Sequence, residues 1–116
     1  MLEVSETREP GVVIVGLAGR LDGITAADLD ARLGQLVAAG ERQVVLDLAR
    51  LEYITSVGLR TILVVAKQLR AGAGKLVIAA LQDPVKQVFD LAGFSALLPI
   101  CSTRREAVAT AQASRV

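Results

Sequence analysis

Short apolar runs of strand length alternate along this chain with segments whose apolar residues recur at helical spacing. The runs QVVLDL at 43–48 and KLVIAA at 75–80 are nearly continuous in apolar residues, as is typical of strands buried on both faces of a sheet. Helical segments between such strands favour parallel pairing, because a parallel connection needs a crossover. The sequence therefore predicts an α/β fold in which helices pack on a mostly parallel, mixed sheet.

The N-terminal residues add a hairpin to this pattern, because Glu9-Pro10-Gly11 marks a turn between two strand-like segments. We expect one domain over residues 1–116, with the order β-β-α-β-α-β-α-β-α. The strands are expected at 2–8, 12–21, 43–48, 75–80 and 96–100, and the helices at 25–40, 56–70, 83–91 and 103–112. The first and last helices each begin with a candidate capping box, Thr25 with Asp28 and Thr103 with Glu106.

Composition excludes several classes of function. The chain has no His and one Cys, which excludes a His-based catalytic triad, a phosphohistidine carrier and a Cys/His zinc site. The net charge of +1 gives no electrostatic reason to expect nucleic acid. Neither a signal sequence nor an apolar run of about 18 residues is present, so we expect a soluble, cytoplasmic protein without membrane insertion. We expect no enzymatic activity, cofactor or metal site.

Two adjacent hydroxyls, Thr55 and Ser56, mark the start of the helix expected at 56–70. One interpretation is structural, because a Ser or Thr side chain can accept hydrogen bonds from the free N–H groups of a helix start. The other is functional, because a phosphate at a helix N-terminus meets those N–H groups and the positive end of the helix dipole. Phosphorylation would add about 1.5 to 2 negative charges, enough to spoil an apolar contact surface. Spacing alone leaves both interpretations open.

A surface for a partner is expected beside these hydroxyls. The apolar stripe expected to face the core comprises Leu59, Ile62, Leu63, Ala66 and Leu69. Val57, Thr61, Val64 and Gln68 lie at helical spacing on a different face, so the two valines are expected to be exposed near Ser56.

Asp47 is a further candidate, because it lies near the expected end of a central strand, where open α/β sheets place their ligands. Such a position suits the phosphate-accepting Asp of a receiver domain. A receiver also needs clustered acidic oxygens for a divalent cation, and the preceding strand VVIVGLAGR has none. The alternative is that Asp47 bonds to local backbone amides.

Three segments resemble the STAS domain of anti-sigma factor antagonists, in the order and spacing of that family. They are GRLDGITA at 19–26, VVLDLARLEYITSVGLR at 44–60 and DPVKQVFDLAGFSALLPI at 83–100. The resemblance implies a partner-switching protein whose unphosphorylated form binds an anti-sigma factor that is also a serine kinase, which releases the sigma factor. The kinase then phosphorylates a Ser at the start of the helix after the third strand, and a metal-dependent serine phosphatase reverses this step.

The resemblance also implies roles for individual residues. Ser56 corresponds to the phosphorylated Ser, with Thr55 as an alternative acceptor. Asp22 matches an acidic residue beside that position, Asp47 a polar residue ending the third strand, and Gly58 a glycine that keeps the helix start open to a partner. Taking the resemblance together with the helical spacing described above, the residues expected to bind a partner are Asp22, Gly23, Ile24, Asp47, Thr55, Val57, Gly58, Thr61 and Val64.

The chain departs from the family pattern Asp-Ser-Ser-Gly, because it reads Thr55-Ser56-Val57-Gly58. The change at Thr55 removes a carboxylate next to the acceptor, which affects recognition by a kinase. STAS domains also resemble accessory subunits of ABC-type lipid transporters and the cytosolic tails of anion transporters. A constitutive accessory subunit is therefore the alternative function, and the Asp47 receiver is a third.

Overall fold

The computed structural model describes residues 1–113 and has the predicted order of elements, with one added 3₁₀ turn. The hairpin, the alternation of strands and helices and the final helix are confirmed. The strands are β1 (Leu2–Glu9), β2 (Val12–Leu21), β3 (Gln43–Ile54), β4 (Lys75–Ala79) and β5 (Ile100–Cys101). The helices are α1 (Ala26–Ala38), α2 (Ser56–Ala71), α3 (Asp83–Leu91), the 3₁₀ turn η1 (Phe94–Ala96) and α4 (Arg104–Ala113).

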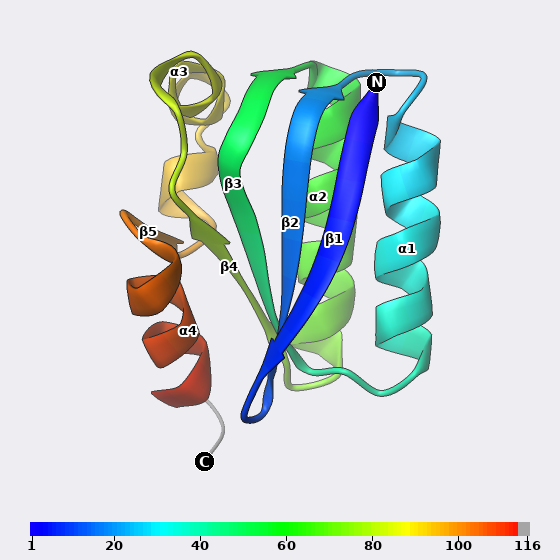
Figure 1. Cartoon of the computed structure of the whole chain (residues 1–116), viewed down its shortest axis with the longest axis vertical. Coiled ribbons are helices and arrows are strands. Elements are labelled where there is room, and N and C mark those ends of the chain that lie inside the picture. The colour runs from blue at the N-terminus through cyan, green and yellow to red at the C-terminus, as the bar shows by residue number, and fades with distance from the viewer. Residues whose placement is uncertain (114–116) are drawn as a thin grey trace.

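The strands form one five-stranded sheet in the order β1-β2-β3-β4-β5 (Figure 1). β1 pairs antiparallel with β2, and the other three pairings are parallel. The β1–β2 connection is short because Gly11 adopts a positive φ of 72°, which a glycine tolerates without steric cost. The predicted mixed, mostly parallel sheet is therefore confirmed.

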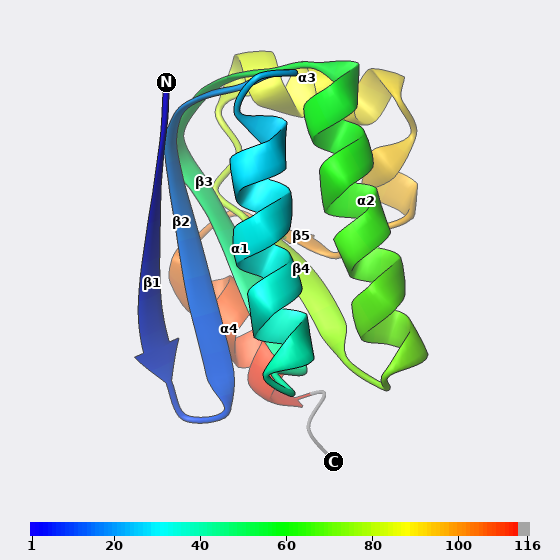
Figure 2. The ribbon, with the colours of Figure 1, turned by 90° about the vertical axis from the view of Figure 1, so that its right-hand side faces the viewer.

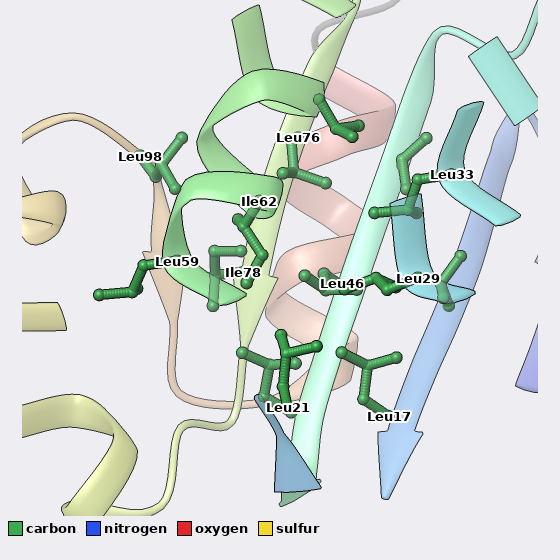
Figure 3. Packing of buried hydrophobic residues seen from close by; sticks show 14 of the residues in the cluster. Leu17, Leu21, Leu29, Leu33, Leu46, Leu59, Ile62, Leu76, Ile78 and Leu98 are labelled. Carbon is green, nitrogen blue, oxygen red and sulfur yellow. The ribbon is translucent and has the colours of Figure 1, made fainter. Parts of the chain in front are cut away.

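Helices cover both faces of the sheet. α1 and α2 lie side by side on one face, and α4 lies behind the sheet on the other (Figure 2). The larger core fills the space between the sheet and the α1–α2 layer, where Leu29 and Leu33 of α1 face Leu46 of β3 (Figure 3). A smaller core of mainly Val and Ala side chains lies under α4. The small side chains Ala107 and Ala111 let α4 lie close to the sheet.

The third strand is longer than predicted, since β3 continues to Ile54 rather than ending at residue 48. Its pairing with β2 shifts register twice, between Gly16 and Ala18 and again between Gly19 and Arg20. Each shift adds a residue to β3 and breaks the two-residue alternation of buried and exposed side chains. The expectation that Asp47 ends this strand is therefore wrong, because Asp47 lies in its middle.

Several boundaries and contacts at the helices also differ from the predictions. The buried stripe of α2 includes Val65, which was not predicted, whereas Leu63 and Ala66 are only partly buried. The N-cap position of helix α3 is Gln82, whose side chain makes no cap hydrogen bond. The last strand is short and begins at Ile100, because residues 94–96 form the η1 turn.

At α4, the Thr103 hydroxyl accepts the Glu106 N–H at 3.1 Å, as the capping box predicts. Within residues 1–113 no helix combines the length and apolarity needed to cross a membrane.

Candidate functional site

The two hydroxyls at the start of α2 have different surroundings. Thr55 is the N-cap residue, with an extended backbone, and its Oγ1 accepts the Gly58 N–H at 3.4 Å. Ser56 is the first residue of the helix and its side chain is exposed. The structural role of a cap therefore belongs to Thr55, which leaves the Ser56 hydroxyl accessible at the positive end of the helix dipole.

Gly58 positions this helix start against the end of β2. It is buried, and a Cβ at this position would lie 2.7 Å from Cγ of Leu21 and 3.2 Å from Cγ1 of Ile54. The Thr55 N–H also donates to the Leu21 carbonyl at 3.0 Å. The close approach leaves no room for a side chain at position 58. The implied role of Gly58 in keeping the helix start open to a partner stays a prediction.

The loop after β2 begins next to this contact, because Asp22 is the residue after Leu21. Oδ1 of Asp22 accepts the backbone N–H groups of Ile24 and Thr25, both at 3.0 Å. The Thr25 backbone hydrogen bond is the largest of the influences that lower the pKa of Asp22 below its ordinary value. The Asp22 carboxylate therefore fixes the shape of the loop beside Ser56.

Thr25 supports the same loop, and its predicted capping box is wrong. Its hydroxyl donates to the Arg20 carbonyl at 2.9 Å and accepts the Asp22 N–H at 3.0 Å. The side chain makes no cap hydrogen bond to α1, and Asp28 N–H instead bonds to the Thr25 carbonyl at 3.1 Å. Because the Thr25 hydroxyl bonds to backbone groups at the end of β2 and just after it, it stabilises the loop rather than the start of α1.

Exposed apolar side chains lie next to the Ser56 position, as predicted. Val57 is 50% exposed and Val64 is 40% exposed, both on α2, and Ile24 in the adjoining loop is 87% exposed. Thr61, half-buried between the valines, donates its hydroxyl to the Val57 carbonyl at 3.3 Å. We call this group of side chains the α2 apolar patch: Ile24, Val57, Thr61 and Val64.

Asp47 does not belong to this surface, because it lies on the opposite face of the sheet. Its Oδ2 is 2.7 Å from Nε of Arg104 at the start of α4, and its Oδ1 accepts the Ala49 N–H at 3.0 Å. The second bond satisfies an amide next to the first register shift of β3. The interpretation that Asp47 bonds to local backbone is confirmed, and residues 1–113 hold no group of His, Cys, Asp and Glu suited to a metal ion.

The structure thus brings together most of the residues implied for partner binding and separates one of them. Asp22, Gly23 and Ile24 adjoin Thr55 and the first turn of α2, whereas Asp47 lies across the sheet. Sequence reasoning missed Leu21 and Ile54, whose side chains impose the glycine at position 58. Both are the last residues of strands whose ends the register shifts bring together, and no sequence signal marks that contact.

Comparison with known proteins agrees with this geometry. The model of the STAS domain family matches residues 3–107. A relative from Bordetella bronchiseptica, BtrV, is 46% identical over 99 residues, which span 85% of each chain, and is named as a candidate anti-sigma factor antagonist. The family match at residues 3–107 therefore includes β2 to β5, the loop after β2 and the start of α2.

Solved structures share the fold at lower identity. An anti-sigma factor antagonist from Mycobacterium paratuberculosis superposes with a TM-score of 0.90 at 23% identity, over 97% of this chain and 95% of its own. SpoIIAA of Bacillus has been solved unphosphorylated, with a TM-score of 0.72 at 18% identity and full coverage of both chains. Its phosphorylated form gives 0.73 at 20% identity, over 95% of this chain and 98% of its own. The chain belongs to the STAS domain family.

Proposed function

We propose that this chain is an anti-sigma factor antagonist of a partner-switching pathway, acting in the cytoplasm. In this proposal the unphosphorylated chain binds an anti-sigma factor through the α2 apolar patch, and the sigma factor is released. The anti-sigma factor is also a serine kinase that transfers the γ-phosphoryl group of ATP to Ser56, which ends the binding. A metal-dependent serine phosphatase restores the binding form. The chain itself supplies a substrate hydroxyl and no catalytic group.

The observation that carries the proposal is that two adjacent residues at the start of α2 have different roles. Thr55 caps the helix and Ser56 is exposed beside the α2 apolar patch. A phosphate on Ser56 would therefore leave the cap in place and would sit where free N–H groups and the helix dipole favour negative charge. The relative BtrV supports the assignment through its name and its 46% identity.

The geometry favours Ser56 over Thr55 as the acceptor. The Thr55 side chain is half-buried and its Oγ1 already accepts the Gly58 N–H, so modification there would remove the cap. Thr55 also replaces the carboxylate of the family pattern without losing the capping role, because Thr and Asp both cap helices. The absence of that carboxylate lowers the electrostatic repulsion that a phosphate on Ser56 would meet.

Binding and phosphorylation test the proposal together. The purified chain would be titrated by calorimetry against each anti-sigma factor encoded in the same genome, and the binding pair would then be incubated with ATP and Mg²⁺. We expect mass spectrometry to place the phosphate on Ser56. Affinity for the anti-sigma factor is expected to fall by about tenfold or more, because a phosphate at an apolar interface must lose its hydration.

Two variants serve as controls in this experiment. Ser56→Ala is expected to bind the anti-sigma factor and to accept no phosphate, whereas Thr55→Ala is expected to be phosphorylated at Ser56. Phosphate retained in the Ser56→Ala variant would move the acceptor to another residue. Binding of no anti-sigma factor, together with co-purification with a transporter ATPase, would favour the accessory-subunit alternative instead.

A further inference from the structure

The exposed face of α2 carries charge of one sign. Ser56–Ala71 contains no Asp or Glu, and its basic residues Arg60, Lys67 and Arg70 are all exposed. The neighbouring helix α1 carries the opposite sign near its start, where Asp28 and Asp30 are exposed. A chain with a net charge of only +1 therefore has a basic surface on one helix.

Spacing places this charge next to the apolar residues. Arg60 and Lys67 are seven residues apart, as are Val57 and Val64, so each pair lies along one side of the helix, two turns apart. Each cation follows a valine by three residues, the spacing of neighbours on a helix surface. We call these four residues the α2 outer face: Val57, Arg60, Val64 and Lys67. All four residues are exposed, and in Figure 2 no other element covers the side of α2 that faces away from the sheet.

The cations of the α2 outer face are available to a partner. The ion pairs among residues 1–113 join Arg8, Arg32, Lys86 and Arg104 to carboxylates, and neither Arg60 nor Lys67 takes part in one. An unpaired cation beside exposed valines fits the polar rim that surrounds the apolar centre of a protein interface. The complementary surface is one that places carboxylates around an apolar centre.

From these observations we infer that the partner docks an acidic surface on the α2 outer face, with carboxylates opposite Arg60 and Lys67. This inference rests on the proposed function and names the chemistry of its partner. Ser56 precedes Arg60 by four residues, one helical turn, so a phosphate on Ser56 lies within reach of the guanidinium. Its charge of about −1.5 to −2 offsets the two cations of the α2 outer face, and the acidic partner loses its attraction.

Association kinetics with the anti-sigma factor that binds the wild-type chain test the inference. The variants are Arg60→Gln, Lys67→Gln and the double variant. The matched control is Arg105→Gln, which removes the same charge from an exposed position of α4, on the other side of the sheet. We expect the association rate constant to fall about threefold in each single variant and about tenfold in the double variant, and to stay unchanged in the control. The difference is expected to shrink as NaCl is raised from about 50 to about 500 mM.

A second measurement needs no partner. In chains carrying phosphoserine at position 56, phosphorus NMR would follow the second ionisation of the phosphate. Arg60→Gln is expected to raise the pKa of the phosphate relative to wild type, and more than Lys67→Gln does, because the nearer cation stabilises the dianion more.

The outcomes separate the inference from the proposed function. Tight, phosphorylation-sensitive binding whose rate is the same in the double variant and in Arg105→Gln would overturn the acidic partner and leave the proposed function intact. An unchanged phosphate pKa in Arg60→Gln would overturn the pairing with Arg60. Failure of the wild-type chain to bind any anti-sigma factor would overturn the proposed function and, with it, the acidic partner.

Discussion

Two aspartates on opposite sides of the sheet make the same local hydrogen bond but have different roles. Asp22, on the loop beside α2, and Asp47, in the middle of β3, each accept the backbone N–H two residues ahead, at 3.0 Å. The Asp22 bond shapes a loop next to the exposed Ser56. The Asp47 bond satisfies a strand irregularity, and its other oxygen pairs with Arg104. The same local motif therefore supports an exposed surface beside α2, whereas on the other face it leaves the Asp47 carboxylate largely buried with both oxygens bonded.

This difference explains why a carboxylate near the predicted end of a central strand does not by itself identify a site. The Asp47 side chain is only 12% exposed and both its oxygens are engaged. Ser56 is exposed at the start of α2, where the adjacent Thr55 accepts the cap hydrogen bond. The two sites differ in which residue bonds to the local backbone. Asp47 itself accepts the Ala49 N–H, whereas beside Ser56 it is the neighbouring Thr55 that accepts the Gly58 N–H.

The largest effect is expected from closing the space at Gly58. Gly58→Ala places a Cβ 2.7 Å from Cγ of Leu21, which is fully buried, so α2 or β2 must shift. We expect the free energy of unfolding to fall by about 2 kcal/mol, since overpacking outweighs the better helix propensity of Ala. The measurement is urea unfolding followed by circular dichroism.

Gly34→Ala in α1 is the matched control, because a Cβ there meets nothing within 4 Å. This substitution is expected to stabilise the chain by about 0.5 to 1 kcal/mol through helix propensity alone. Equal effects of the two substitutions would show that Leu21 yields easily and that Gly58 does not set the position of α2.

A smaller effect is expected on the other face. Asp47→Ala removes the ion pair with Arg104 and the acceptor of the Ala49 N–H, and should lower the free energy of unfolding by about 1 kcal/mol. Affinity for the anti-sigma factor is expected to stay within about twofold of wild type, because Asp47 lies across the sheet from the α2 apolar patch. A tenfold loss of affinity in a fully folded variant would place this face in the interface.

Thr55 provides the next smaller effect. Thr55→Ala removes the cap hydrogen bond, and because that bond is long at 3.4 Å we expect a loss of only about 0.5 to 1 kcal/mol. Thr55→Ser keeps a hydroxyl at the same position and should stay within about 0.3 kcal/mol of wild type. Thermal unfolding of both variants measures the difference, and equal losses would mean that the hydroxyl does not cap α2.

The order of elements was predictable because it depends on periodicity, which a sequence displays directly. The apolar runs of β2 and β4 and the stripes of α1 and α2 each predicted their element with small errors in its bounds, and the run at 43–48 predicted the first half of β3. The extension of β3 to Ile54 was not predictable in the same way. Two register shifts space its buried residues Leu48, Leu51 and Ile54 three apart, which matches neither the strand nor the helix period.

The candidate site was predictable in position but not in its internal roles. The pair Thr55 and Ser56 stood out in the sequence, whereas the choice between cap and exposed hydroxyl depended on where the helix begins, a matter of one residue. Thr25 shows the same limit, because its hydroxyl bonds to Arg20 and Asp22 before the helix rather than to the helix itself. In both cases the role of the hydroxyl depends on hydrogen bonds to residues within five positions, which apolar periodicity does not reveal.

The smallest effect concerns the Asp22 carboxylate and pH. Its pKa is lowered in the folded chain, chiefly by the hydrogen bond from the Thr25 N–H, so the folded state favours the ionised form. Its contribution to stability is therefore complete above the ordinary value of 3.8 and is lost as pH falls below that value through the lowered pKa.

Asp22→Asn isolates this contribution, because the amide oxygen can accept the same hydrogen bonds and does not titrate. Asp90 also has a lowered pKa, owing first to the Ser95 hydroxyl and then to Lys86, and it titrates identically in both proteins. Urea unfolding at about pH 6 and about pH 3 should therefore show a larger loss of stability on acidification for wild type than for Asp22→Asn. Equal losses would mean that the loop beside Ser56 is held by the Thr25 hydroxyl rather than by the charge of Asp22.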